Sequence, residues 1–290
     1  MKMRKEYILA SVIIVASILY LVLRSDSKVN YDIPRFSDVD KNSITEITIS
    51  ETGESLKLKK TDNSWTIEPQ GYKADKSLVN KLLSESSTIS IVDLISDRED
   101  YARFELENNS AVTVRISTSE GPVREFLLGK SSSSSVYSYI RLPGQKGVYS
   151  VRGNLKNTFK SSMDEWRDKQ VLSFDPEAVI AIEITKDKNT VLLSRIPVTE
   201  STPQWSKHGE VLENSDEIQN QAKTFSILKC SAYLEETSGD PLASLKIKTA
   251  DGEQTLSLYE KLDNGYSARS TYVNDPFLLP LYLSNMILEL

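Results

Sequence analysis

Few residues of this 290-residue sequence have side chains typical of acid–base or nucleophilic catalysis. It contains one histidine, His208, and one cysteine, Cys230. These counts exclude an intramolecular disulfide, a cysteine-rich zinc or iron–sulfur site, and a site held by a histidine pair. His208 lies in a polar turn and is expected to be exposed. Cys230 follows apolar residues and is expected to be a small residue of the core.

Two other groups of side chains could support hydrolysis. Ser131–Ser135 follow Lys130, but a serine–lysine dyad needs a lysine whose pKa is lowered by burial. Asp97–Asp100, and Asp38 with Asp40, offer carboxylate pairs of the kind that glycosidases use. The first of these acidic groups lacks the spacing of a calcium loop. All of these segments are polar, as solvated loops are, so a hydrolase is the least favoured hypothesis.

No motif for nucleotide binding, for a serine nucleophile or for a metalloprotease occurs in the sequence. The net charge is -6 and the isoelectric point about 5.2, which argues against nucleic-acid binding because phosphates require a basic surface. We therefore predict no catalytic residue, no cofactor, no metal and no nucleic-acid partner.

Tyrosine, arginine and tryptophan give a weak indication of a binding surface, because these residue types are enriched at protein interfaces. The same alternation also fits ordinary sheet faces. An Arg–Asp pair at Arg167 and Asp168 is expected to hold two repeats together rather than to catalyse a reaction. The candidates for partner binding or inter-repeat contact are Trp166, Arg167, Asp168, Tyr139, Arg141, Tyr266 and Arg269.

The elements that must position these residues occur twice along the chain. Apolar and polar residues alternate in short segments, which predicts strands, and one helix follows the third strand of each set. Trp65 and Trp205 occupy matching places, which favours a role in the core. The first set comprises strands at 44–49, 55–59, 65–67, 89–95, 111–116, 124–128, 136–142 and 147–151, with a helix capped by Asp75 and a closing helix capped by Asn154. The second comprises strands at 179–184, 190–194, 204–206, 242–247, 254–258 and 266–269, with a helix capped by Asn214 and a closing helix opened by Pro276.

The N-terminal segment Tyr7–Leu23 contains no charged residue. As a helix it would be ~25 Å long, close to the roughly 30 Å of a bilayer core. Lys2, Arg4 and Lys5 precede it, which keeps the N-terminus cytoplasmic. A cleaved signal peptide is the alternative, but Leu21–Arg24 is a poor cleavage site.

The predicted fold is therefore α+β, with an N-terminal transmembrane helix and two tandem repeats, each an antiparallel β-sheet with a packed helix. The predicted parts are 1–24 (cytoplasmic tip and membrane anchor), 25–40 (stalk), 41–172 (first repeat) and 173–290 (second repeat). The apolar segment Phe277–Leu290 is too short to span a bilayer and is expected to dock on the second repeat.

The chain resembles the domain-of-unknown-function 4340 family, and the stretch from Trp166 to Lys169 is the most specific part of the likeness. Glu105 stands where that family has a glycine. The other segments that carry the resemblance are 44–49, Trp65, 72–75, 104–107, 126–129, 139–141, 147–151 and 171–174. The resemblance implies a membrane-anchored extracytoplasmic protein, often encoded beside ABC-type transporter subunits of the gliding-motility kind.

Three functions follow as hypotheses. The first is a non-enzymatic, single-pass anchored interaction protein, an accessory subunit of a transport, gliding or envelope complex. Its partners would be the membrane, through Tyr7–Leu23, and a membrane protein such as a transporter subunit. The second is a binding module for an envelope polymer or small ligand in an inter-repeat cleft. The third is the hydrolase considered above.

Overall fold

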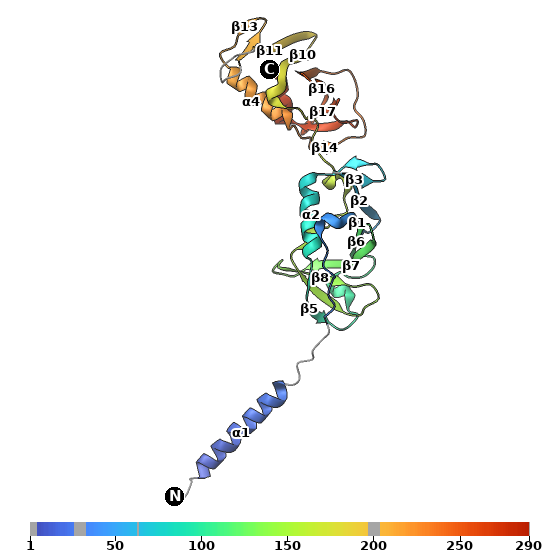
Figure 1. Cartoon of the computed structure of the whole chain (residues 1–290), viewed down its shortest axis with the longest axis vertical. Helices are drawn as coiled ribbons and strands as arrows, with labels where there is room; N and C mark the ends of the chain where they lie inside the picture. Colours follow the sequence, from blue (N-terminus) through green and yellow to red (C-terminus); the bar gives the residue numbers. More distant parts are fainter. Residues whose placement is uncertain (1–4, 26–32, 63, 197–203, 290) are drawn as a thin grey trace. The chain divides into compact units, whose positions relative to one another are not determined.

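A computed structural model of the chain describes residues 5–25, 33–62, 64–196 and 204–289 (Figure 1). It contains an N-terminal helix, α1 (Lys5–Ser25), and two nine-stranded sheets. The chain divides into two compact units, which we call unit 1 (Met1–Glu54 with Leu82–Lys160) and unit 2 (Ser55–Lys81 with Ser161–Leu290).

The first sheet has the strand order β4-β3-β2-β1-β6-β7-β8-β9-β5. Its strands are β1 (Ile44–Glu51), β2 (Glu54–Thr61), β3 (Ser64–Glu68), β4 (Tyr72–Lys73), β5 (Ile91–Ser96), β6 (Val112–Thr118), β7 (Gly121–Ser131), β8 (Tyr137–Arg141) and β9 (Val148–Arg152). Helix α2 (Lys76–Thr88) connects β4 to β5.

The second sheet has the order β13-β12-β11-β10-β15-β16-β17-β18-β14. Its strands are β10 (Val179–Lys186), β11 (Asn189–Ile196), β12 (Gln204–Lys207), β13 (Glu210–Val211), β14 (Ala232–Tyr233), β15 (Ala243–Thr249), β16 (Gly252–Leu262), β17 (Gly265–Ser270) and β18 (Phe277–Pro280). Helix α4 (Ser215–Ser226) connects β13 to β14, as α2 connects β4 to β5. The two orders are the same when β1 is matched with β10, which confirms the predicted internal repeat and its antiparallel sheets.

The starts of the predicted helices after Asp75 and Asn214 are confirmed by α2 and α4, but only one of these two residues is a side-chain cap. The Oδ1 atom of Asp75 accepts hydrogen bonds from the backbone N–H groups of Ser77 and Leu78, at 2.8 and 3.0 Å, so Asp75 caps α2. Asn214 precedes α4, but its side chain makes no capping bond; its Nδ2 atom instead donates to Glu217 at 3.3 Å. The prediction that Asn214 is a side-chain cap was therefore wrong.

The predicted closing helices also differ from the structure. Asn154 accepts a hydrogen bond from the hydroxyl of Ser131 at 2.8 Å and is followed by a 3-10 turn, Leu155–Asn157, and by the single helical turn α3 (Met163–Trp166). After Pro276 the chain first forms β18, and helix α5 (Leu281–Leu288) begins only after that strand. The segment does dock as predicted, because Phe277, Leu279 and Ile287 are fully buried in the core of unit 2.

Trp205 belongs to that core and has no exposed surface, whereas Trp65 is only half-buried. The shared core role is therefore confirmed for the second tryptophan, while the first lies at the margin. Cys230 is buried in the same core and His208 is exposed, as predicted.

The end of the predicted stalk is held against the first sheet by a buried arginine of β7, Arg124. Its Nη2 atom donates to the carbonyl oxygens of Ser37 and Ser87, at 3.0 and 3.2 Å, and its Nη1 atom donates to the carbonyl oxygen of Ser86. Phe36 lies 5.4 Å from the same guanidinium and 6.0 Å from the ring of Phe126. Because Ser86 and Ser87 are in the last turn of α2, Arg124 joins that helix end to residues 36–37.

Every side chain of α1 from Leu9 to Leu21 is exposed. Within the described part of the chain, no helix is both long and apolar enough to cross a membrane.

Candidate functional site

A cleft of about 480 Å³ opens in unit 2, which we call the tyrosine cleft. It is lined by Gln70, Gly71, Tyr72, Lys73, Arg167, Asp168, Gln170, Tyr233, Tyr272, Val273, Asn274 and Asp275. Its size falls within the range of small-molecule sites.

Backbone hydrogen bonds of the segment that follows α3 bring these residues together. The N–H of Asp75 donates to the carbonyl of Trp166 at 2.7 Å, and the N–H of Asp168 donates to the carbonyl of Lys73 at 2.8 Å. A few residues later the same segment bonds to a different part of unit 2, because the N–H of Val171 donates to the carbonyl of Leu228 at 2.9 Å. The segment 166–171 is therefore fixed along most of its length, and the side chains of Arg167 and Asp168 are fixed with it.

Arg167 is the most deeply buried charged residue of the cleft, with 8% of its surface exposed. Its guanidinium carbon lies 3.7 Å from the ring centroid of Tyr72 and 3.3 Å from that of Tyr233, and it forms an ion pair with Asp275. A planar guanidinium suits this combination because it stacks on aromatic rings while its edge donates to a carboxylate.

Asp168 pairs with Lys73, and its Oδ2 atom lies 2.9 Å from Nζ. The hydrogen bond with Asp168 raises the pKa of Lys73, so the lysine is held in its charged form. The hydroxyl of Tyr233 donates to the backbone carbonyl of Asp168 at 2.7 Å, and burial raises the pKa of Tyr233. Arg167 and Asp168 are thus paired with Asp275 and Lys73 respectively, and not with each other as the sequence suggested.

Trp166 and Tyr266, two further predicted site residues of unit 2, do not line the cleft. Trp166 is buried, and Tyr266 is half-buried against the core. Arg269 is exposed and its Nε atom donates to the hydroxyl of Thr237 at 2.9 Å.

Tyr139 and Arg141 lie in unit 1. The ring of Tyr139 packs edge-on against Phe104 at 4.9 Å, and the guanidinium of Arg141 lies 4.4 Å from the ring of Tyr101. The side chains of these two residues thus pack onto their own unit.

Sequence analysis did not single out Tyr233, Tyr272 or Asp275, which are far along the chain from Arg167. The sequence could have indicated Tyr72 and Lys73 as candidates, because they belong to one of the segments that carry the family resemblance. Both that segment and the stretch 166–169 contribute to the tyrosine cleft.

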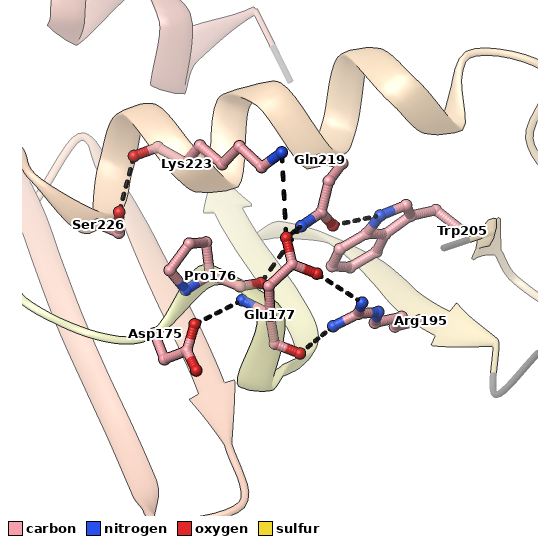
Figure 2. Close-up of polar contacts among 8 residues, drawn as sticks. All are labelled: Asp175, Pro176, Glu177, Arg195, Trp205, Gln219, Lys223 and Ser226. Carbon is pink, nitrogen blue, oxygen red and sulfur yellow. Dashed lines mark hydrogen bonds and ion pairs between the residues drawn. The ribbon is translucent and has the colours of Figure 1, made fainter. Parts of the chain in front are cut away.

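A second polar cluster surrounds Glu177, in the turn before β10 (Figure 2). Its carboxylate pairs with Arg195 at 3.0 Å and accepts a hydrogen bond from the Nε2 atom of Gln219 at 3.1 Å. The Oε1 atom of Gln219 in turn accepts from the indole N–H of Trp205 at 3.3 Å. Both carboxylate oxygens are thereby occupied, and the cluster satisfies a buried indole, so its role is to stabilise the fold.

Two of the side chains considered for hydrolysis make hydrogen bonds within the fold. The hydroxyl of Ser131 donates to Asn154, and the carboxylate of Asp100 accepts from Ser96 at 2.8 Å. Among the described residues, no group of three or more histidine, cysteine, aspartate or glutamate side chains could hold a metal ion.

Burial raises the pKa of the Cys230 thiol to about 11, above its ordinary value of 9.0. Because the thiolate is the reactive form, the folded chain at pH 8 is expected to react with a maleimide far more slowly than the chain unfolded in guanidinium chloride. The same shift predicts that stability falls as the pH rises from about 9 to about 11, since the unfolded state releases this proton first. The chain has one cysteine, so the rate of labelling reports on Cys230 alone. Equal rates in the two states would contradict the buried position.

A protein-family model described as a domain of unknown function (DUF4340) matches residues 65–249. This range includes the helix of each repeat and most of the segments that form the tyrosine cleft. No curated protein and no solved structure matches the chain.

Proposed function

The chain belongs to the DUF4340 family, and on this basis we propose that it is a single-pass membrane-anchored extracytoplasmic interaction protein. In this proposal α1 holds the chain in the cytoplasmic membrane, and the sheet units bind a membrane-protein partner. The partner class that the family resemblance suggests is a subunit of an ABC-type transport, gliding or envelope complex. The chain itself would perform no catalysis.

The exposed apolar surface of α1 is the observation that carries the proposal. Eight of its aliphatic side chains are 55–65% exposed, namely Leu9, Val12, Ile13, Ile14, Val15, Ile18, Leu19 and Leu21. Exposure of this much contiguous apolar surface to water is unfavourable, and a lipid bilayer would remove it from water. The basic residues Lys2, Arg4 and Lys5 lie on the N-terminal side, which supports an orientation with the N-terminus in the cytoplasm.

The proposal predicts that the full-length chain sediments with membranes and resists extraction by alkaline carbonate. A variant carrying Ile14→Arg and Ile18→Arg is expected to move largely to the soluble fraction, because an arginine near the bilayer centre costs about 2.5–3.5 kcal/mol. The matched control carries Ile180→Arg and Val211→Arg, which replace two exposed apolar residues of unit 2. If the wild type is extracted as readily as the α1 variant, the anchor is absent.

The partner is tested on the same membranes by solubilising them in mild detergent and recovering the full-length chain. Stoichiometric recovery of a transporter permease or ATPase subunit is the expected result. A chain in which residues 7–23 are replaced by an unrelated membrane segment then locates the contact, because retention of the subunit assigns it to the sheet units. Recovery of the chain alone would reject the accessory-subunit role.

A further inference from the structure

The charges of the tyrosine cleft are balanced within the cleft itself. Lys73 is paired with Asp168, and Arg167 with Asp275, so the lining carries two positive and two negative side chains. Each charged side chain of the lining is already paired with an opposite charge, so an ionic ligand would compete with an existing pair, which is unfavourable in a partly buried site. The cleft is therefore suited to a ligand without net charge.

Several polar groups of the cleft have no partner for their side chains. In the part of the chain that the structure describes, the amides of Gln70 and Asn274 and the hydroxyl of Tyr72 make no hydrogen bond. An amide offers both donors and acceptors, and a tyrosine hydroxyl can do either. Groups of this mixed kind match the hydroxyls of a polyol, which also donate and accept.

Tyr272 adds a flat apolar surface beside these groups, since 37% of this residue is exposed. After Asp168, Tyr272 also contributes to the raised pKa of Lys73, so its hydroxyl lies near that ammonium group. The rings of Tyr72 and Tyr233, by contrast, are in contact with Arg167. Tyr272 is therefore the ring best placed to pack against the C–H face of a ligand.

We propose that the tyrosine cleft binds an uncharged sugar unit, with the pyranose ring packed on Tyr272 and its hydroxyls bonded to Gln70 and Asn274. An uncharged pyranose combines an apolar face with a rim of hydroxyls, which are the two properties that this lining recognises. The sugar could belong to a soluble oligosaccharide or to an envelope polymer, and the chemistry of recognition is the same for both. The proposal is independent of the membrane anchor, so either can fail without the other.

The test uses the full-length chain in a zwitterionic detergent, because detergents with sugar headgroups would compete for the cleft. Binding of maltotriose, cellotriose and chitotriose is measured by titration calorimetry and by saturation-transfer NMR. Purified peptidoglycan sacculi, tested by co-sedimentation, provide the polymer arm. Binding in the first arm identifies a soluble sugar as sufficient, and binding only in the second identifies the polymer.

Tyr272→Ala and Asn274→Ala are each expected to weaken binding about tenfold. The matched control is Tyr282→Ala, which removes a tyrosine of unit 2 that is 68% exposed and lies outside the cleft. Its binding should equal that of the wild type, and far-UV circular dichroism should show all three variants folded. Absence of binding in both arms, or equal binding by all variants, would overturn the proposal. Tighter binding of trigalacturonic acid than of the uncharged sugars would also overturn it.

Discussion

The free energy of unfolding of the Arg167→Ala chain is expected to be about 3–5 kcal/mol lower than that of the wild type. The substitution removes the buried guanidinium from the rings of Tyr72 and Tyr233 and leaves Asp275 without its cation. It also leaves a void where the side chain was packed, because Arg167 is almost fully buried. Urea unfolding followed by far-UV circular dichroism measures the loss.

Two other arginine substitutions show whether burial and shape cause this effect. Arg115 makes two hydrogen bonds to Glu125, both at 3.1 Å, but its side chain is 55% exposed. Arg115→Ala should therefore lower the free energy of unfolding far less than Arg167→Ala does, because solvent screens an exposed ion pair. Arg167→Lys keeps the charge but loses the planar stacking group, so it should recover less than half of the stability lost in Arg167→Ala. Equal losses for Arg115→Ala and Arg167→Ala would contradict a special role for the buried arginine.

The second large effect is expected for Trp205→Ala, which should lower the free energy of unfolding by about 3–5 kcal/mol. Trp205 is fully buried, and its removal also leaves the Oε1 atom of Gln219 without the indole donor. Far-UV circular dichroism is the suitable measurement, because tryptophan fluorescence changes with the substitution itself.

Trp65→Ala is the natural comparison, since Trp65 occupies the corresponding strand of the first repeat but is only half-buried. Its cost should be less than half of that of Trp205→Ala, because less apolar surface is lost from the folded state. A larger loss for Trp65→Ala would show that exposure does not determine the difference between the two repeats.

The regular strands could be predicted from the sequence because one of their faces is buried. In β1 the buried Ile47 and Ile49, and in β10 the buried Ile182 and Ile184, alternate with polar residues, and this period of two indicates a strand. The internal repeat could be predicted because the same strand pattern occurs twice, each time followed by a tryptophan. Helix α4 buries Ile218, Ala222 and Phe225, the face that its spacing predicts.

The predictions for the ends of the repeats failed where local sequence was ambiguous. The apolar run Phe277–Pro280 has no polar alternation, and its pairing with β17 and β14 makes it a strand. Asn154 was expected to cap a helix, but its side chain is bonded to Ser131, 23 residues earlier. Tertiary contacts decided both cases, and neither contact is visible in a local pattern.

The tyrosine cleft was only partly predictable for the same reason. Arg167 and Asp168 were candidates, but their partners come from residues 72–73 and 275, which are distant in the chain. Two charges that are adjacent in sequence suggest a pair, whereas in an extended segment neighbouring side chains point in opposite directions. Arg167 and Asp168 therefore pair with different residues, Asp275 and Lys73.

The hydrogen bonds of Arg124 have a mechanical consequence. If α1 is fixed in a membrane, any force that pulls the chain away from it reaches the first sheet through residues 36–37 before it reaches β1. The carbonyl of Ser37 and the ring of Phe36 would receive that force first, and Arg124 would pass it to β7 and to the end of α2. The tension would then be shared between a strand inside the sheet and a helix, and β1 would be protected from being peeled from its neighbours.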